Sequence, residues 1–169
     1  MENKTFCVWG QSETQLAKQI ASGFECMPVV VCLGDPNVLA DCFAPVVGSM
    51  LKQSWNGYVY GTVDAPILAS NVDDTLRFVK SVHKDKKILI VDASTTKTPS
   101  RLGSIVLAQN YVPFNKRLKS IEADYFLFGV LSVFQNTFPN LVGTKLLLVK
   151  KLATILTLAL KQIKPTFPL

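Results

Sequence analysis

The sequence predicts an α/β protein, a three-layer αβα sandwich around a mostly parallel mixed sheet, formed as a single domain over residues 1–169. Two short runs, residues 29–33 and 88–91, are strongly apolar, rich in β-branched side chains and bounded by turn residues. Such runs are typical of parallel strands buried on both faces. Helices are expected between the strands, and this alternation indicates a sheet with helices on both sides.

The first part of the chain is expected to contain two strands, with one helix before them and a second helix between them. Ser12 can cap a helix that runs to about Phe24, because apolar residues recur at helical spacing after it. A buried strand then covers residues 28–33, and a short strand covers residues 58–61.

A second helix is expected between these two strands. It would start near Asn37, carry Asp41 in its early turns and run toward Gln53. Pro45 lies inside this helix and lacks a backbone N–H, so it removes one hydrogen bond and predicts a kink or a break.

The middle of the chain predicts a further helix and strand. Asn71 is a good N-cap, and Asp73 and Asp74 favour the positive end of the helix dipole, so a helix is expected from there to about Lys84. The second buried strand follows and ends directly at Asp92. Further strands are expected over residues 103–108 and 125–133.

The last helix is the clearest element of the sequence. Its apolar face contains Leu148, Leu152, Ile155, Leu156, Ala159 and Ile163. Its opposite face contains Lys150, Thr154, Thr157, Lys161 and Lys164. This pattern favours a helix packed on the sheet over a helix on a membrane surface. The uncharged run over residues 152–160 is also far short of the ~20 residues that span a bilayer.

Composition narrows the function classes. The formal charge is +6, but the basic residues are scattered and not interleaved with aromatic ones, which argues against nucleic-acid binding. The chain shows no secretory pattern, so a cytoplasmic location without membrane attachment is expected. The four cysteines have no CxxC spacing and there is one histidine, which favours free thiols over a zinc site. No nucleotide-binding or serine-hydrolase motif occurs, and neither a metal nor a cofactor is expected.

The most informative feature is a pair of aspartates, Asp41 and Asp92, each just beyond one of the buried runs. Ligand sites in open α/β sheets collect outside the carboxyl ends of the strands, so neighbouring strands would place both carboxyl groups in one crevice. Because two neighbouring carboxylates repel each other, the pKa of one of them rises, and the two groups can then act as an acid and a base. Each aspartate also has a structural explanation, because Asp41 can stabilise a helix N-terminus and Asp92 can turn the chain after a strand.

Other catalytic schemes have less support. A serine nucleophile at Ser94 needs a positioned base, and the one histidine, His83, is expected on an exposed helix among lysines. Cys42 follows Asp41 but is more simply a buried structural thiol. Asp35 is expected to form an Asx turn.

The two aspartate segments resemble the active-site segments of the spore germination protease. Residues 31–45 follow its pattern of an apolar strand, a glycine, a polar turn with asparagine, and then an aspartate and a helix with proline. Residues 90–94 resemble its second Asp-Ala segment. The overall layout is closer to the YyaC family of small sporulation proteins, which later blocks of the chain also resemble, over residues 58–66, 115–118 and 142–146.

This resemblance implies a phosphorylase/hydrolase-like αβα fold, shared with hydrogenase-maturation endopeptidases, in a sporulating bacterium. It also implies that Asp41 and Asp92 form a metal-free catalytic pair, in which one activates water and the other, protonated, polarises the scissile carbonyl. The residues expected to bind substrate are Asn37, Ser94, Lys116 and Lys145, and the two lysines can supply positive charge.

Three functions stay open at this point. The first is a sporulation-associated peptidase-like protein of the forespore or spore interior, which cleaves a protein such as a small acid-soluble spore protein. The second is a non-catalytic sporulation factor that uses the same cleft to bind a peptide or protein. The third is a basic protein that associates with spore DNA or with acid-soluble spore proteins.

Overall fold

The structure is a computed structural model that describes residues 3–109, 122–133 and 144–164. The strands in these residues are β1 (Asn3–Cys7), β2 (Val29–Cys32), β3 (Val59–Tyr60), β4 (Ile88–Thr96), β5 (Ser104–Gln109) and β6 (Tyr125–Val133). The helices are α1 (Glu13–Ala21), α2 (Phe43–Lys52), α3 (Val72–Val82), α4 (Leu146–Lys161) and the short 3-10 helix η1 (Pro99–Arg101).

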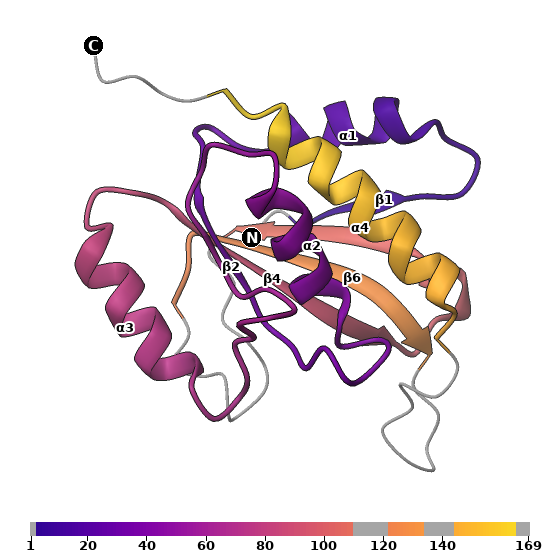
Figure 1. The fold of residues 1–169 in the computed structure, drawn as a ribbon. Coiled ribbons are helices and arrows are strands. Elements are labelled where there is room, and N and C mark those ends of the chain that lie inside the picture. The colour runs from indigo at the N-terminus through magenta and orange to yellow at the C-terminus, as the bar shows by residue number, and fades with distance from the viewer. Residues whose placement is uncertain (1–2, 110–121, 134–143, 165–169) are drawn as a thin grey trace.

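All described strands form one sheet in the order β1-β5-β6-β4-β2-β3. Strands β6, β4, β2 and β3 run parallel, β5 runs antiparallel to β6, and β1 runs antiparallel to β5. Helices α1, α2 and α4 pack on one face and α3 packs on the other (Figure 1). The predicted three-layer αβα arrangement with a mostly parallel mixed sheet is confirmed.

The neighbouring strands β2 and β4 are buried as predicted. All four residues of β2 and the first four residues of β4 are buried. Side chains alternate between the faces of a strand, so Val30 and Cys32 join the core beneath α1, α2 and α4, whereas Val29 and Val31 join the core beneath α3. Burial on both faces explains why both runs are almost continuously apolar.

Most element boundaries lie close to their predicted positions. The Ser12 hydroxyl accepts a hydrogen bond from the backbone N–H of Gln15 at 3.2 Å and caps α1, which ends at Ala21. Helix α3 starts after Asn71, although the Asn71 side chain accepts a hydrogen bond from the Leu68 N–H instead of capping the helix. Strands β3, β5 and β6 lie within one residue of the predicted ranges.

The start of the second helix is different from the prediction. Helix α2 begins at Phe43, so Asp41 lies in the loop before the helix and not in its early turns. Pro45 is the third residue of α2, where the backbone N–H has no partner within the helix, so its absence leaves no helical hydrogen bond unmade. The predicted kink or break therefore has no cause here.

Two strands are also different. Strand β4 continues to Thr96, four residues beyond Asp92, because β6 pairs with it along this length. Strand β1 was not predicted, since its sequence is largely polar. It pairs with β5 at the edge of the sheet, and four of its five residues are exposed, so this strand carries no buried apolar pattern.

The apolar face of α4 is buried as predicted, but Thr157 was placed on the wrong face. It is 3% exposed, and its hydroxyl lies 3.9 Å from the Met50 sulfur on α2. Helix α4 packs against both α1 and α2, which widens its buried face. None of the helices in the described residues combines the length and the apolar character needed to span a bilayer.

His83 is buried, in contrast to the exposed position expected from its lysine neighbours. It ends α3, and its Nε2 lies 2.8 Å from the hydroxyl of Tyr60 on β3. Its ring packs at 4.3 Å from the ring of Tyr58. Burial first, and then the charge of Lys86, lowers the pKa of His83, so the contact favours the neutral imidazole.

This contact predicts a pH-dependent stability. Because the pKa of His83 is lower in the fold than in the unfolded chain, the unfolded state binds more protons below about pH 6.5, and acid favours unfolding. We expect His83→Gln to lose less unfolding free energy than the wild type when urea titrations at about pH 7 and about pH 5 are compared. Equal losses in the two proteins would contradict this account.

Candidate active site

Asp92 lies at the level where β2 stops pairing with β4. The register of β2 and β4 ends at Cys32 opposite Val91, and the last bond runs from the Leu33 N–H to the Val91 carbonyl at 2.9 Å. On its other side β4 continues, with Asp92 opposite Phe128 of β6. Asp92 thus lies inside β4, and the strand that ends beside it is its neighbour β2.

The sheet order makes this position a topological switch point. From β2 the chain continues to β3 on one side, whereas from β4 it continues to β5 and β6 on the other side. Helices α2 and α3, which follow β2 and β3, lie on opposite faces (Figure 1). Ligand crevices in open α/β sheets form at the carboxyl ends of strands at such points.

The loop between β2 and α2 brings Asp41 back to the end of β2. The Asp41 carboxylate accepts a hydrogen bond from the backbone N–H of Asp35 at 2.7 Å. Gly34 packs against the Asp41 backbone with φ +146°, and a Cβ added there would overlap the Asp41 carbonyl oxygen. Glycine is therefore needed at this position for the loop to hold Asp41 close to β4.

Asp35 and Asn37 form the predicted Asx turn in this loop. The Asp35 carboxylate accepts hydrogen bonds from the backbone N–H and the side-chain amide of Asn37, both at 2.9 Å. Such side-chain bonds compete with helix formation, which explains why α2 starts only at Phe43. Asn37 is exposed and bonded to Asp35, and its predicted role in substrate binding stays a prediction.

The two carboxyl groups interact electrostatically. Burial, and then the charge of Asp41, raises the pKa of Asp92 to about 7, although a hydrogen bond from the Ala93 N–H opposes this at 2.7 Å. Burial also raises the pKa of Asp41, the Asp35 N–H lowers it, and the Asp35 charge raises it. Near neutral pH this arrangement favours one protonated carboxyl, at Asp92, beside one carboxylate at Asp41.

Cys42 next to Asp41 is unsuited to act as a nucleophile. Burial and the Asp41 charge raise the pKa of its thiol, and the thiol donates a hydrogen bond to the Leu39 carbonyl at 3.1 Å. A raised pKa keeps the thiol protonated, whereas the thiolate is the reactive form. All four cysteines are free, as predicted, and the pKa of the buried Cys32 is raised by burial.

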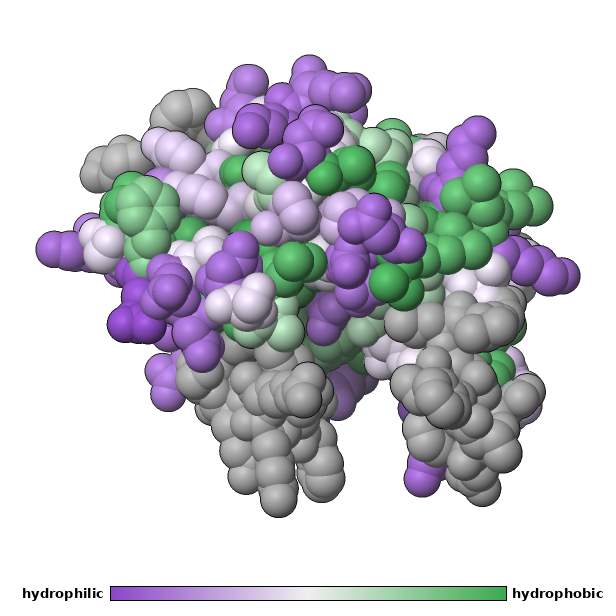
Figure 2. All heavy atoms as spheres, turned by 60° about the horizontal axis from the view of Figure 1, so that its bottom comes forward, coloured by the Kyte–Doolittle hydropathy of each residue, from purple (hydrophilic) through white to green (hydrophobic). Residues whose placement is uncertain are grey.

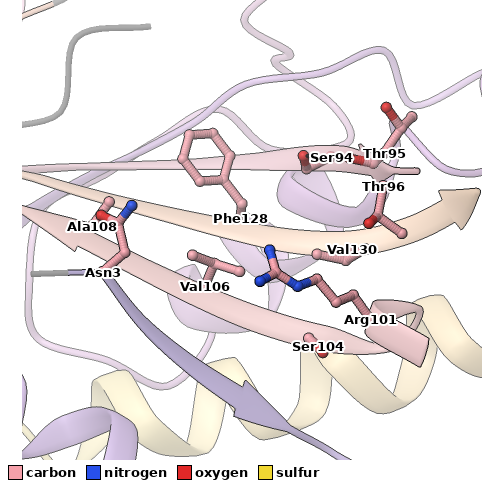
Figure 3. A pocket seen from close by; sticks show the side chains of 10 residues that line it. All are labelled: Asn3, Ser94, Thr95, Thr96, Arg101, Ser104, Val106, Ala108, Phe128 and Val130. Atoms are coloured by element: carbon pink, nitrogen blue, oxygen red, sulfur yellow. Dashed lines mark hydrogen bonds between the residues drawn. The ribbon is translucent and has the colours of Figure 1, made fainter. Parts of the chain in front are cut away.

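The other predicted site residues are at different places. Ser94 is two residues beyond Asp92 on β4 and lines a cavity on the sheet face (Figure 3). Lys145 is exposed at the start of α4, and the adjacent Thr144 hydroxyl bonds the Leu131 carbonyl of β6 at 3.0 Å. Lys116 lies outside the described residues. The roles of Ser94, Lys116 and Lys145 in substrate binding stay predictions.

One residue near the site was not found from the sequence. Arg101 belongs to η1, and Figure 3 shows its guanidinium group over the sheet in the same cavity as Ser94. A Thr-Pro-Ser-Arg-Leu-Gly stretch gave no periodic or motif signal at this position. Only the path of the chain between β4 and β5 places Arg101 there.

Apolar side chains are exposed in the Asp41 loop. Val38 and Leu39 are 36% and 41% exposed, and they lie within three residues of Asp41. Figure 2 shows that hydrophobic side chains on the face it presents form several small groups among hydrophilic ones. The site therefore offers local apolar contacts next to the carboxyl pair.

No group of three or more His, Cys, Asp or Glu side chains in residues 3–109, 122–133 and 144–164 is arranged to hold a metal ion.

Comparison with known proteins identifies relatives of the chain. Residues 7–159 match the family described as "Protein of unknown function (DUF1256)". The uncharacterized protein YyaC of Bacillus subtilis (strain 168) is 31% identical over 136 residues, which cover 76% of this chain and 65% of that protein. The alignment spans somewhat less than two thirds of the length of this relative. The family match over residues 7–159 contains both Asp41 and Asp92. Because the match covers most of its length, the chain belongs to the DUF1256 family.

Proposed function

We propose that this protein is a sporulation-associated peptidase that cleaves a protein substrate with the carboxyl pair Asp41 and Asp92. The observation that carries this proposal is the pairing of two carboxyl groups at a switch point, where the charge of Asp41 helps to raise the pKa of Asp92 to about 7. Pairs of titratable groups with separated pKa values are typical of acid/base sites.

The reaction assigned to this pair needs the two carboxyl groups and water. The Asp41 carboxylate takes a proton from water, and the water oxygen bonds to the scissile carbonyl carbon. Asp92 gives its proton to the carbonyl oxygen, which relieves the charge that develops there. When the tetrahedral intermediate collapses, the C–N bond breaks and the leaving nitrogen takes the proton held by Asp41. The carbonyl oxygen then returns its proton to Asp92.

The proposed setting is the forespore or spore interior. The support for it is the resemblance of residues 31–45 and 90–94 to the active-site segments of the spore germination protease. Small acid-soluble spore proteins are the proposed first substrate to test, because they are proteins of the spore interior that this resemblance implies.

The test is proteolysis of purified small acid-soluble spore proteins by the wild type, Asp41→Asn and Asp92→Asn. We expect cleavage by the wild type and a loss of about 100-fold or more in both variants, since general acid–base catalysis contributes about 10²–10⁴-fold. Asp85→Asn is the matched control, because Asp85 is an exposed aspartate in the turn between α3 and β4. This control should cleave like the wild type.

Two results would contradict the proposal. Undiminished cleavage by Asp92→Asn would exclude the carboxyl pair as the catalytic group. Absence of cleavage by the wild type, with tight binding of the same proteins, would favour the non-catalytic binding factor.

A further inference from the structure

The sheet face beside Asp92 carries a cavity of about 210 Å³. Its walls come from β1, β4, β5, β6 and η1 (Figure 3). The lining residues Ala108 and Phe128 belong to the same sheet face as the core beneath α3. Ligand pockets for drug-sized molecules measure about 300–1,000 Å³. A cavity of this size instead fits one side chain or one chain terminus.

The cavity combines an apolar floor with polar groups at its rim. The floor is formed by Val106, Phe128 and Val130, and these residues alternate along β5 and β6 so that they share one face. Hydroxyl groups are contributed by Ser94, Thr95, Thr96 and Ser104. This composition suits a ligand with a short aliphatic part and a polar end.

Arg101 supplies the positive charge of the cavity. Figure 3 shows its side chain extending from η1 across the sheet, with the guanidinium group near Val106 and Phe128. Within the described residues, no carboxylate forms an ion pair with Arg101 and no acceptor bonds its guanidinium group. A planar guanidinium group of this kind matches a carboxylate in two parallel hydrogen bonds.

The cavity lies next to the carboxyl pair. Ile90 and Val91 point to opposite cores, and the alternation continues through Asp92 to Ser94, which therefore share the face of Ile90. Phe128, which pairs with Asp92, lines the cavity, and so does Ser94. Two residues along a strand correspond to about 7 Å. A substrate group bound in the cavity is thus one or two residues away from a peptide bond held at Asp92.

From these observations we infer that the Arg101 cavity binds a carboxylate of the substrate chain, either an acidic side chain or the C-terminal carboxylate, next to the bond that is cleaved. This inference rests on the proposed function for the identity of the substrate as a peptide. The guanidinium group binds the carboxylate, and the apolar floor contacts the aliphatic part. The Ser94 and Thr96 hydroxyls donate to the Thr95 and Thr98 carbonyls, each at 3.4 Å, so the assigned carboxylate is held by Arg101.

The test measures peptide binding, so it does not depend on cleavage. Three acetylated peptides are titrated into ¹⁵N-labelled protein: Ala-Glu-Ala-Ala with an amidated C-terminus, the same peptide with Gln for Glu, and Ala-Ala-Ala with a free C-terminal carboxylate. Dissociation constants come from the amide shifts of residues around the cavity, such as Ser94 and Val106. We expect one of the two carboxylate peptides to bind about tenfold or more tightly than the Gln peptide.

Variants of Arg101 separate binding from a structural role. Arg101→Gln should weaken the binding of the preferred carboxylate peptide by about tenfold or more and leave the binding of the Gln peptide unchanged. Arg101→Lys should retain part of the preference for the carboxylate peptide, because it keeps the charge without the planar guanidinium group. Arg77→Gln removes the same charge from α3, where Arg77 pairs with Asp74 outside the cavity, and should have no effect.

Each outcome decides a separate question. A preference for the Glu peptide identifies an acidic side chain as the ligand, and a preference for the free terminus identifies a chain end. Equal binding of all three peptides, or an unchanged preference in Arg101→Gln, would overturn the inference. If peptide binding depends on Arg101 but no cleavage occurs, the assignment of the cavity stands and the peptidase proposal is rejected. If cleavage occurs but peptide binding does not depend on Arg101, the peptidase proposal stands and the assignment of the cavity is rejected.

Discussion

Asp92→Asn is expected to stabilise the fold by about 2 to 4 kcal/mol at about pH 8, while it abolishes the proposed cleavage. The pKa of Asp92 is about 7 in the fold and close to 3.8 in the unfolded chain. Between these values the folded state binds more protons than the unfolded state, so the stability that Asp92 contributes is present in acid and is lost as the pH rises through about 7. Complete loss corresponds to about 4 kcal/mol, which is an upper bound.

The measurement is urea unfolding of the wild type and Asp92→Asn across this pH range. The difference in unfolding free energy should be largest above about pH 7 and should vanish near pH 4. Asp41→Asn provides a second comparison. Removal of the Asp41 charge lowers the pKa of Asp92, so the fall in unfolding free energy that accompanies ionisation of Asp92 should occur at lower pH. A constant difference at all pH values would show that the carboxyl group of Asp92 does not titrate near neutrality.

Gly34→Ala is expected to destabilise the protein by about 3 kcal/mol or more and to remove the proposed activity. Its φ of +146° is unfavourable for any residue with a Cβ, and the new methyl group would overlap the Asp41 carbonyl oxygen. Relief of this overlap requires the loop of residues 34–42 to move away from β2. Asp41 would then leave its position beside Asp92.

Gly10→Ala is the matched control for this variant. Gly10 also has a positive φ, +79°, but a Cβ added there would meet no atom within 4 Å. It should therefore cost only the backbone strain of about 1 to 2 kcal/mol and leave the activity intact. Thermal or urea unfolding gives the stabilities, and the cleavage assay gives the activities. Similar losses in both variants would show that the contact with Asp41 is not what requires glycine at position 34.

Much of the fold could be predicted because its central elements carry local patterns. Strands β2 and β4 are buried on both faces, so their apolar runs are almost continuous, and α4 shows its buried face through helical spacing. Strand β1 has no such pattern, because it lies at the sheet edge and its partner in β5 is distant in sequence. The burial of His83 was also hidden, since it depends on Tyr58 and Tyr60 from another element.

Part of the arrangement at the candidate site could also be predicted from the sequence, whereas the roles of its residues stay predictions. The expectation that Asp41 and Asp92 share a crevice followed from the rule for the carboxyl ends of parallel strands, and the sheet order agrees with it. The loop conformation that holds Asp41 depends on Gly34 and on the bond to the Asp35 N–H, which are tertiary features. Arg101 reaches the site through the path of a connection, and no sequence spacing encodes that path.

The edge position of β1 has a consequence for synthesis of the chain. Asn3 pairs with Ala108, so the ribosome makes β1 about a hundred residues before its partner exists. At roughly 5 to 20 residues per second, the N-terminal segment waits on the order of 5 to 20 s without a strand to pair with. Its polar composition then serves a purpose, because an exposed strand with few apolar side chains has little tendency to associate with other nascent chains.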